Sequence, residues 1–250
     1  EQGRAPDFRE VHPSMRLLLA LVAILALATP ARAGVTQGEP PQEAPRMIKA
    51  GSERFPVSLS LEARAEMNRQ ARMRLARLAA AEGDILTWGQ ALFPEKFPLP
   101  FCQELHGYFV SIRGEAFTNT EAPRGHAKTT IECFLIPLYQ ALVEPESFRH
   151  YLNVQATSTK ADAVNMAIKL ELEENAELRE LYGDQVTKSR WTNSQFVLAN
   201  NVIFSSIGAG QSIRGINYRN IRPDYILIDD LYDEEDINNV EATEKKNDWF

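Results

Sequence analysis

The hexapeptide YILIDD at residues 225–230 restricts the possible folds more than any other stretch of this sequence. Four consecutive apolar residues without alternation are typical of a strand that is covered on both faces, as strands of parallel sheets are. Two aspartates end the run, and open α/β sheets bind ligands at the carboxyl ends of their strands. The stretch therefore predicts an α/β fold with a ligand site beside Asp229 and Asp230.

Strand-like runs alternate with helical stretches through the second half of the sequence. The expected strands lie at 116–121, 151–156 and 195–207, and the expected helices lie at 102–112, near 127–142 and at 159–180. The run at 195–207 predicts a hairpin that turns at Asn200 and Asn201. This alternation predicts a mostly parallel central sheet that is flanked by helices.

The N-terminal part of the chain has a different composition. Residues 15–33 combine an arginine, a continuous apolar stretch and Ala-Arg-Ala, which is the pattern of a secretory signal peptide. Proline and polar residues follow at 34–46, and apolar side chains at helical spacing from Ser60 to Ala81 predict an amphipathic helix. We expect three parts: a signal-like and linker segment at 1–46 outside the fold, a helical extension at 47–84, and the main domain at 85–250.

Two interpretations of the signal-like segment stay open. A genuine signal peptide predicts a secreted protein whose mature chain begins at Gly34. The alternative is an upstream reading frame joined to a protein that begins at Met47, and it agrees better with an ATP-dependent activity inside the cell.

The overall charge and the cysteines exclude several classes of protein. The 27 basic and 34 acidic residues leave a formal net charge of −7, which argues against a wholly basic nucleic-acid coat. The two cysteines, Cys102 and Cys133, form no CxxC pair and have no zinc-like spacing with the four histidines. A disulfide framework and a structural zinc site are therefore not expected.

The stretch EAPRGHAKTT at residues 121–130 resembles the phosphate-binding loop G-x-x-x-x-G-K-[ST]. Ala122 and Ala127 stand at the two glycine positions, and Gly125 lies between them. We expect Gly125 to take the left-handed part of the turn. Ala127 can replace the second glycine of the pattern if the backbone at this position needs no positive φ.

Lys128 and Thr129 supply the chemistry of such a loop. Successive backbone N–H groups wrap the phosphates at a helix N-terminus, Lys128 reaches the terminal phosphates, and the Thr129 hydroxyl binds Mg²⁺. At the end of the YILI strand lie Asp229 and Asp230, and one of the two carboxylates is expected to hold the Mg²⁺ while its neighbour orients or deprotonates the attacking water. Loop and strand together predict a P-loop NTPase that uses ATP and Mg²⁺.

APRGHAKTT, followed by GAGQSIRGINYRNIRPDYILIDDL, resembles the ATPase domain of the large terminase subunit of tailed bacteriophages. That subunit is the motor that packages DNA into the empty capsid. The resemblance covers roughly residues 85–250, and it implies a P-loop fold of the ASCE type with a helical N-terminal extension.

The resemblance also implies roles for individual residues. Arg124 matches an arginine that acts on the γ-phosphate, and Asp229 matches the Mg²⁺ carboxylate. Asp230 stands where many relatives carry a catalytic glutamate, so water positioning is assigned to Asp230, Glu234 or Glu235. Gln103 matches a glutamine that reads adenine. The residues expected to bind ATP are Gln103, Ala122, Pro123, Gly125, His126, Ala127, Lys128, Thr129 and Thr130.

The implied partners are those of the whole motor. They are the backbone of double-stranded DNA, contacted without sequence preference, the portal protein, the small terminase subunit, and further copies of the chain in a ring on the procapsid. Arg214 and Arg219 are candidates for contacts with phosphate, DNA or a neighbouring subunit. The expected location is the cytoplasm of the bacterial host, with no membrane partner. The family's coupling motif and nuclease domain follow the acidic strand, so no nuclease activity is expected from these residues.

Two alternatives to the packaging motor remain. One is a helicase-like P-loop ATPase of another system. The other is a nucleotide-binding remnant that does not hydrolyse ATP, which the alanines at the glycine positions would explain.

Overall fold

The computed structural model describes residues 48–50, 53–55, 61–98, 101–115, 117–232 and 239–249. The signal-like segment and Met47 lie outside these residues. The chain divides into two compact units between Arg74 and Leu75, inside helix α2 (Leu61–Glu82). The helix predicted from Ser60 to Ala81 is confirmed as a helix. In the first unit, β1 (Ile48–Ala50) and β2 (Glu53–Phe55) form an antiparallel pair.

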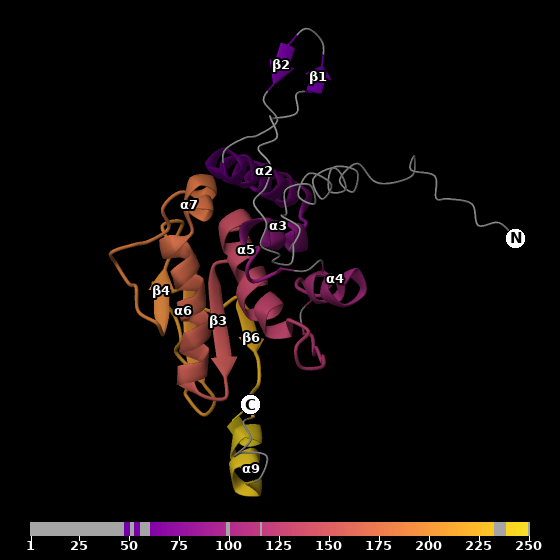
Figure 1. The fold of residues 1–250 in the computed structure, drawn as a ribbon. Coiled ribbons are helices and arrows are strands. Elements are labelled where there is room, and N and C mark those ends of the chain that lie inside the picture. The colour runs from indigo at the N-terminus through magenta and orange to yellow at the C-terminus, as the bar shows by residue number, and fades with distance from the viewer. Residues whose placement is uncertain are drawn as a thin grey trace, which may run out of the picture. The chain divides into compact units, whose positions relative to one another are not determined.

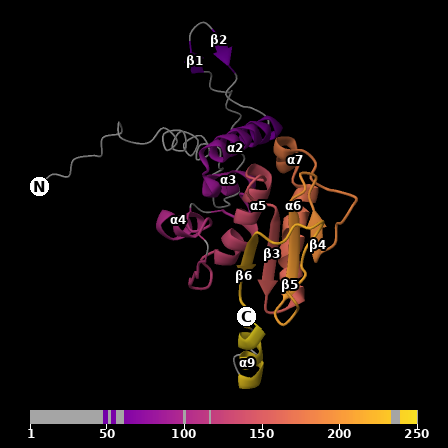
Figure 2. The same cartoon turned by 180° about the vertical axis from the view of Figure 1, so that it is seen from behind.

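The second unit contains a four-stranded sheet in the order β4-β5-β3-β6 (Figures 1 and 2). The strands are β3 (His150–Gln155), β4 (Gln195–Val197), β5 (Ile203–Gly208) and β6 (Tyr225–Ile228). β3 pairs in parallel with both β5 and β6, whereas β4 pairs antiparallel with β5 through the predicted hairpin. The prediction of an α/β fold with a mostly parallel sheet is confirmed.

The two faces of the sheet are covered differently. On one face the Tyr151 hydroxyl donates to the carbonyl of Cys133, and the Asn153 amide donates to the carbonyl of Ala161, so helices cover this face. On the other face the His150 ring bonds the carbonyl of Ile221, in the connection between β5 and β6. That connection carries no described helix, so an irregular segment covers β3 on this side.

The expected helix at 159–180 is two helices, α6 (Ser158–Glu174) and α7 (Ala176–Tyr182). Asn175 separates them in an extended conformation, and its side-chain oxygen accepts from the N–H groups of Glu177 and Leu178. Asparagine is a favoured N-cap, so the break has a local cause. The other helices of this unit are α3 (Ile85–Leu92), α4 (Gln103–Ser111), the π-helix η1 (Thr130–Leu135), α5 (Ile136–Val143) and α9 (Val240–Trp249).

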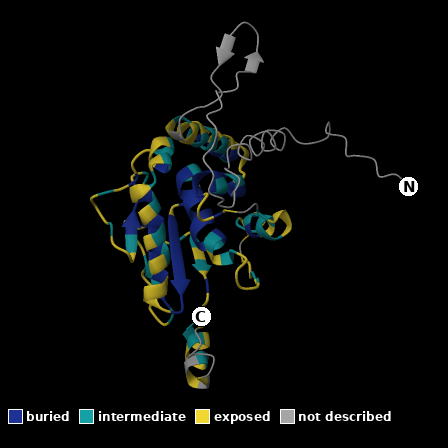
Figure 3. Ribbon diagram, in the orientation of Figure 1, coloured by how far each residue is buried: buried dark blue, intermediate teal, exposed yellow. Residues whose placement is uncertain are grey.

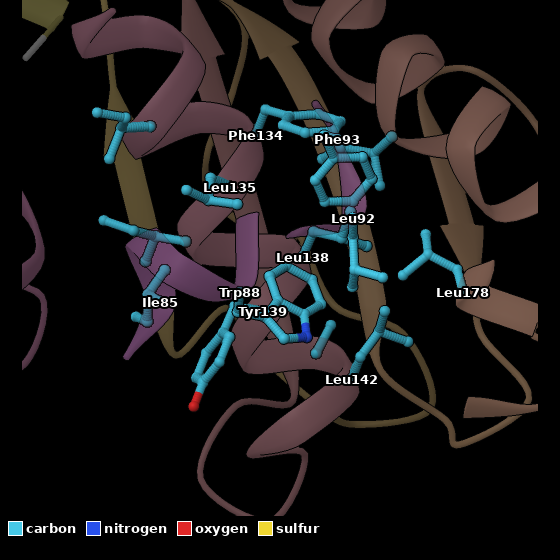
Figure 4. Packing of buried hydrophobic residues seen from close by; sticks show 14 of the residues in the cluster. Ile85, Trp88, Leu92, Phe93, Phe134, Leu135, Leu138, Tyr139, Leu142 and Leu178 are labelled. Carbon is cyan, nitrogen blue, oxygen red and sulfur yellow. The ribbon is translucent and has the colours of Figure 1, made fainter. Parts of the chain in front are cut away.

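Trp88 is the centre of the helical part of the core (Figure 4). Its ring makes edge contacts with Phe93 at 5.7 Å and Tyr139 at 5.2 Å, and its Nε1–H donates to the Tyr182 hydroxyl at 2.7 Å. β3 is buried along its whole length (Figure 3), and Tyr151 joins this core to the aromatic side chains of the sheet.

The expected strand at 116–121 is absent. Residues 117–123 are irregular, and Phe117 is almost fully exposed. The sequence FTNTEA offers too few apolar side chains for a strand inside a parallel sheet, which is the physical reason for the error.

β6 was expected to be covered on both faces, and this is also wrong. β6 is an edge strand, and no described strand pairs with its outer edge. Ile226 is 51% exposed and Ile228 is 38% exposed, whereas Tyr225 and Leu227 pack against the core. The carboxyl end of β6 nevertheless lies where the site requires it, beside β3.

None of the helices in the described part of the chain is both long enough and apolar enough to cross a membrane.

Candidate functional site

The stretch at 121–130 forms an open turn that leads into a helix (Figure 1). Gly125 has φ +82°, as expected for the left-handed part of the turn. Ala127 has φ +58°, so the condition stated for an alanine at this position, a backbone without a positive φ, is not met. A left-handed conformation costs an L-residue about 1–2 kcal/mol, which other contacts of the turn must offset.

The backbone N–H groups of residues 125–130 donate no hydrogen bond to any described residue. The first donor of the helix is Ile131, whose N–H bonds the carbonyl of Ala127 at 2.8 Å. Six consecutive donors at a helix N-terminus that no described residue satisfies, with positive φ angles among them, make a positively polarised surface that favours an anion.

The helix that follows begins at Lys128 and continues to the end of α5, so the helix predicted near 127–142 is confirmed in extent. Its segment Thr130–Leu135 is a π-helix. π-helical turns are rare and are frequent at functional sites. Here the wider turn comes directly after Lys128 and Thr129.

Asp229 connects this helix to the sheet. The Lys128 ammonium lies 2.7 Å from Asp229 Oδ1, and the Thr129 hydroxyl donates to Asp229 Oδ2 at 2.7 Å. Asp229 directly follows β6, and its N–H bonds the carbonyl of Val154 on β3 at 3.0 Å. Two segments that lie about a hundred residues apart in the sequence therefore meet at one carboxylate, as the sequence pattern required.

The pKa values of the pair reflect mutual stabilisation. Burial alone would raise the pKa of Asp229, which is 3% exposed, but hydrogen bonds from Lys128 and Thr129 lower it below its ordinary value. Burial would lower the pKa of Lys128, but the hydrogen bond and charge of Asp229 raise it instead. Both groups are therefore charged at neutral pH.

Two further residues of η1 belong to this site and were missed by the sequence analysis. The Cys133 thiol lies 3.5 Å from Asp229 Oδ2, and burial followed by the Asp229 charge raises the thiol pKa well above its ordinary value. Burial also raises the pKa of Glu132, against a hydrogen bond with Thr120 and the charge of Lys128. Their positions four residues after Lys128 and Thr129 could have indicated a shared helix face.

The other predicted catalytic residues are less closely placed. Asp230 is exposed with φ +44°, and its carbonyl accepts from the N–H of Ala156 at 3.2 Å. Arg124 is exposed on the turn, and no ion pair with a described carboxylate holds it. Glu234 and Glu235 lie outside the described residues.

Gln103 is the first residue of α4 and is exposed, without a hydrogen bond to the turn. Its helix reaches the turn through another residue, because His106 Nε2 lies 3.2 Å from the carbonyl oxygen of His126. The His126 ring folds back on the turn, with Nδ1 at 3.1 Å from the carbonyls of Pro123 and Arg124. His126 therefore helps to close the turn, a role that the sequence did not indicate.

Arg214 and Arg219 lie on the connection between β5 and β6. Arg219 stacks over the Tyr218 ring at 5.2 Å and has φ +50°, and both arginines are exposed. Neither makes a described contact with Lys128 or Asp229.

The donors present suit Mg²⁺. A threonine hydroxyl and a carboxylate are hard oxygen ligands, and Mg²⁺ commonly takes only one or two protein ligands together with phosphates and water. Thr129 and Asp229 already lie within hydrogen-bonding distance of each other, so one ion could contact both. The described residues contain no group of three His, Cys, Asp or Glu side chains that could hold a metal without such help.

An open groove of about 470 Å³ adjoins Thr129. Its lining comes mainly from η1 and α6, and the lining residues are Lys96, Thr129, Thr130, Cys133, Phe134, Ala163, Val164 and Ala167. Of the residues expected to bind ATP, Thr129 and Thr130 line this groove, whereas Lys128 and Asp229 do not.

Comparisons of the chain with models of protein families, with curated proteins and with solved structures found no match.

Proposed function

We propose that this chain binds ATP with Mg²⁺ at residues 122–130 and hydrolyses it, as the ATPase domain of a viral DNA-packaging motor. The observation that supports the proposal best is the convergence of Lys128 and Thr129 on Asp229, next to six backbone N–H groups that have no partner among the described residues. A lysine, a hydroxyl and a carboxylate around an anion-binding turn are the parts that phosphoryl transfer requires.

Each residue has a distinct task in the proposed reaction. The N–H groups of the turn and the Lys128 ammonium bind the β- and γ-phosphates and neutralise the charge that develops on them. Thr129 and Asp229 would hold the Mg²⁺, which when bound neutralises phosphate charge. When the ligand binds, the Lys128 ammonium must give up its ion pair with Asp229 and contact phosphate instead.

Hydrolysis consumes one water molecule. The water oxygen forms a bond to the γ-phosphorus while the bond from that phosphorus to the β–γ bridging oxygen breaks, and the products are ADP and phosphate. Asp230 or Glu234 is proposed to orient the water and accept its proton, and Arg124 is proposed to stabilise the γ-phosphate oxygens.

The motor context rests on the resemblance of residues 85–250 to terminase ATPase domains. In that context hydrolysis drives double-stranded DNA through a ring of subunits at the portal, together with a small terminase subunit. The proposed site is compatible with a helicase-like ATPase as well, because both use the same phosphate chemistry.

Lys128→Ala tests the proposed site. Isothermal titration calorimetry with MgATP should show binding to the wild-type chain and a loss of at least tenfold in Lys128→Ala, since the variant removes the phosphate ligand and leaves Asp229 buried without its cation. Lys188→Ala is the matched control, because Lys188 is an exposed lysine outside the site, and it should bind like the wild type.

Turnover is measured on the same samples as released phosphate. Turnover in the wild type that is lost in Lys128→Ala supports the enzyme. Binding that depends on Lys128 without any turnover supports the non-hydrolysing alternative, and equal binding by all three proteins refutes the proposed site.

A further inference from the structure

His106 joins helix α4 to the turn that carries Lys128. Its Nδ1 accepts a hydrogen bond from the N–H of Cys102 at 2.9 Å, and its Nε2 lies 3.2 Å from the carbonyl oxygen of His126. Because Nδ1 is the acceptor, a neutral ring carries its proton on Nε2, which then donates to His126. The two contacts fix the tautomer.

Aromatic neighbours also fix the orientation of the His106 ring. Phe101 makes an edge contact at 5.3 Å, and Phe109, which is buried, lies at 6.1 Å. Two aromatic rings and the start of α4 hold the His106 ring in place. Its Nε2–H donor therefore has little freedom to move with the turn. The His126 carbonyl therefore has a fixed partner.

The carbonyl of His126 and the N–H of Ala127 belong to the same peptide group. The described chain has no cis peptide bond, so these two groups point in opposite directions. A carbonyl that is held toward α4 keeps the N–H of Ala127 directed away from α4. This N–H is one of the six that have no partner among the described residues.

The same contact explains how Ala127 keeps φ +58°. Without an anchor, rotation of the peptide between His126 and Ala127 would relieve the left-handed conformation and turn the N–H aside. A glycine at this position would not need the anchor, since it takes positive φ freely. His106 thus compensates for the alanine that replaces the second glycine of the loop pattern.

We infer that His106 is a positioning residue, which holds the His126 carbonyl so that the Ala127 N–H stays available to a bound phosphate. The inference rests on the proposed function for the identity of the anion. It assigns to α4 the support of the phosphate-binding turn.

Two near-isosteric substitutions separate the two hydrogen bonds of His106. His106→Gln places an amide donor near the position of Nε2 and keeps the bond to His126. His106→Asn is shorter, so it keeps an acceptor for the Cys102 N–H and loses the bond to His126. Titration calorimetry with MgATP should show affinity within about twofold of the wild type for His106→Gln, and affinity weaker by about 3- to 10-fold for His106→Asn, the range of one net hydrogen bond.

The double variant His106→Asn/Ala127→Gly provides a rescue that a purely structural role of His106 would not give. Glycine restores the positive φ without the anchor, so the double variant should recover most of the lost affinity. Equal affinity of His106→Asn and the wild type, or failure of the glycine to restore binding, overturns the inference.

A measurement without nucleotide separates this inference from the proposed function. The amide resonance of Ala127 in the ¹H–¹⁵N spectrum of the free protein should shift in His106→Asn and stay near its wild-type position in His106→Gln. If the resonance follows this pattern but Lys128→Ala binds MgATP like the wild type, the positioning by His106 stands and the ATP site fails. If Lys128→Ala loses binding and the resonance is the same in all three proteins, the ATP site stands and the positioning fails.

Discussion

Asp229 carries a charge although it is 3% exposed, and its neighbours explain how. Lys128 and Thr129 occupy its two oxygens at 2.7 Å each, which offsets the desolvation of the carboxylate. A buried ion pair contributes little net stability, but the loss of one partner is strongly destabilising. The pair is therefore better understood as a pre-arranged site than as a source of stability.

His150 predicts how the stability of the fold depends on pH. It is fully buried, its Nε2 lies 2.9 Å from the Ser205 hydroxyl, and its Nδ1 bonds the carbonyl of Ile221. Burial lowers its pKa below the ordinary value of 6.5, although the bond to Ile221 and the charge of Asp224 oppose the shift.

The sign follows from proton uptake. Above pH 6.5 both the folded and the unfolded chain hold this histidine neutral, so its full contribution is present. As the pH falls below 6.5, the unfolded chain takes up the proton first, and the free energy of unfolding falls by at most about 1.4 kcal/mol per pH unit until the folded pKa is reached. Urea unfolding at a series of pH values should show this decline, and His150→Gln should flatten it. The same decline in the variant would contradict the assignment.

Single residues of the site were predictable only in part. The Lys-Thr pair and the aspartate at a strand end are local patterns, and the geometry of parallel sheets brings them together. The φ of Ala127 and the role of His106 were not predictable, because both depend on a contact between segments that lie 20 residues apart. Nothing in the local sequence specifies that contact.

At the scale of elements, α3 and η1 pack at unusually close range. A Cβ atom added at Gly89 would lie 2.5 Å from Leu135 Cδ1, so the two helices depend on a glycine at their contact. Leu135 ends the π-helix that begins at Thr130. The position of η1, and of the Lys128 turn before it, is therefore coupled to α3.

Gly89→Ala should lower the free energy of unfolding by about 1–3 kcal/mol through overpacking. Gly107→Ala is the matched control, because a Cβ there meets only the end of the Gln103 side chain at 3.9 Å, and alanine is favoured by about 1 kcal/mol in a helix. Thermal or urea unfolding of the three proteins provides the measurement. Equal behaviour of both variants would show that Leu135 moves aside without cost.

Most elements were predictable because their signals are local. The strands at β3 and β6, the hairpin at Asn200 and Asn201, and the helices at α4 and α5 follow apolar runs and turn residues. The break at Asn175 also has a local capping signal, which the helical periodicity on both sides obscured. The π-helix has no such signal, since it results from packing.

At the scale of the whole molecule, the sheet ends at β6, whose outer edge pairs with no strand in the described part of the chain and which exposes two isoleucines. The sequence could not reveal this, because four apolar residues look the same in a central strand and in an edge strand. What decides the outcome is whether another strand pairs with β6, and the polar stretch at 117–123 does not supply one.

An exposed apolar edge strand promotes self-association. Ile226→Lys should therefore reduce the association of this chain at high protein concentration, as measured by sedimentation velocity, without lowering its thermal stability. Leu170→Lys is the control, because Leu170 is 48% exposed on α6, where the backbone is already paired. Unchanged association in Ile226→Lys would indicate that the edge is not the contact surface.

The ion pair of Lys128 and Asp229 has one more consequence, which concerns the rate of encounter. The two charges cancel at short range, and the whole chain has a net charge of −7. A polyanion in solution is therefore not steered toward the turn over long distances. Capture depends on collisions that bring the anion directly against the free N–H groups, so salt should alter the speed of association far less than it does for sites with unbalanced positive charge.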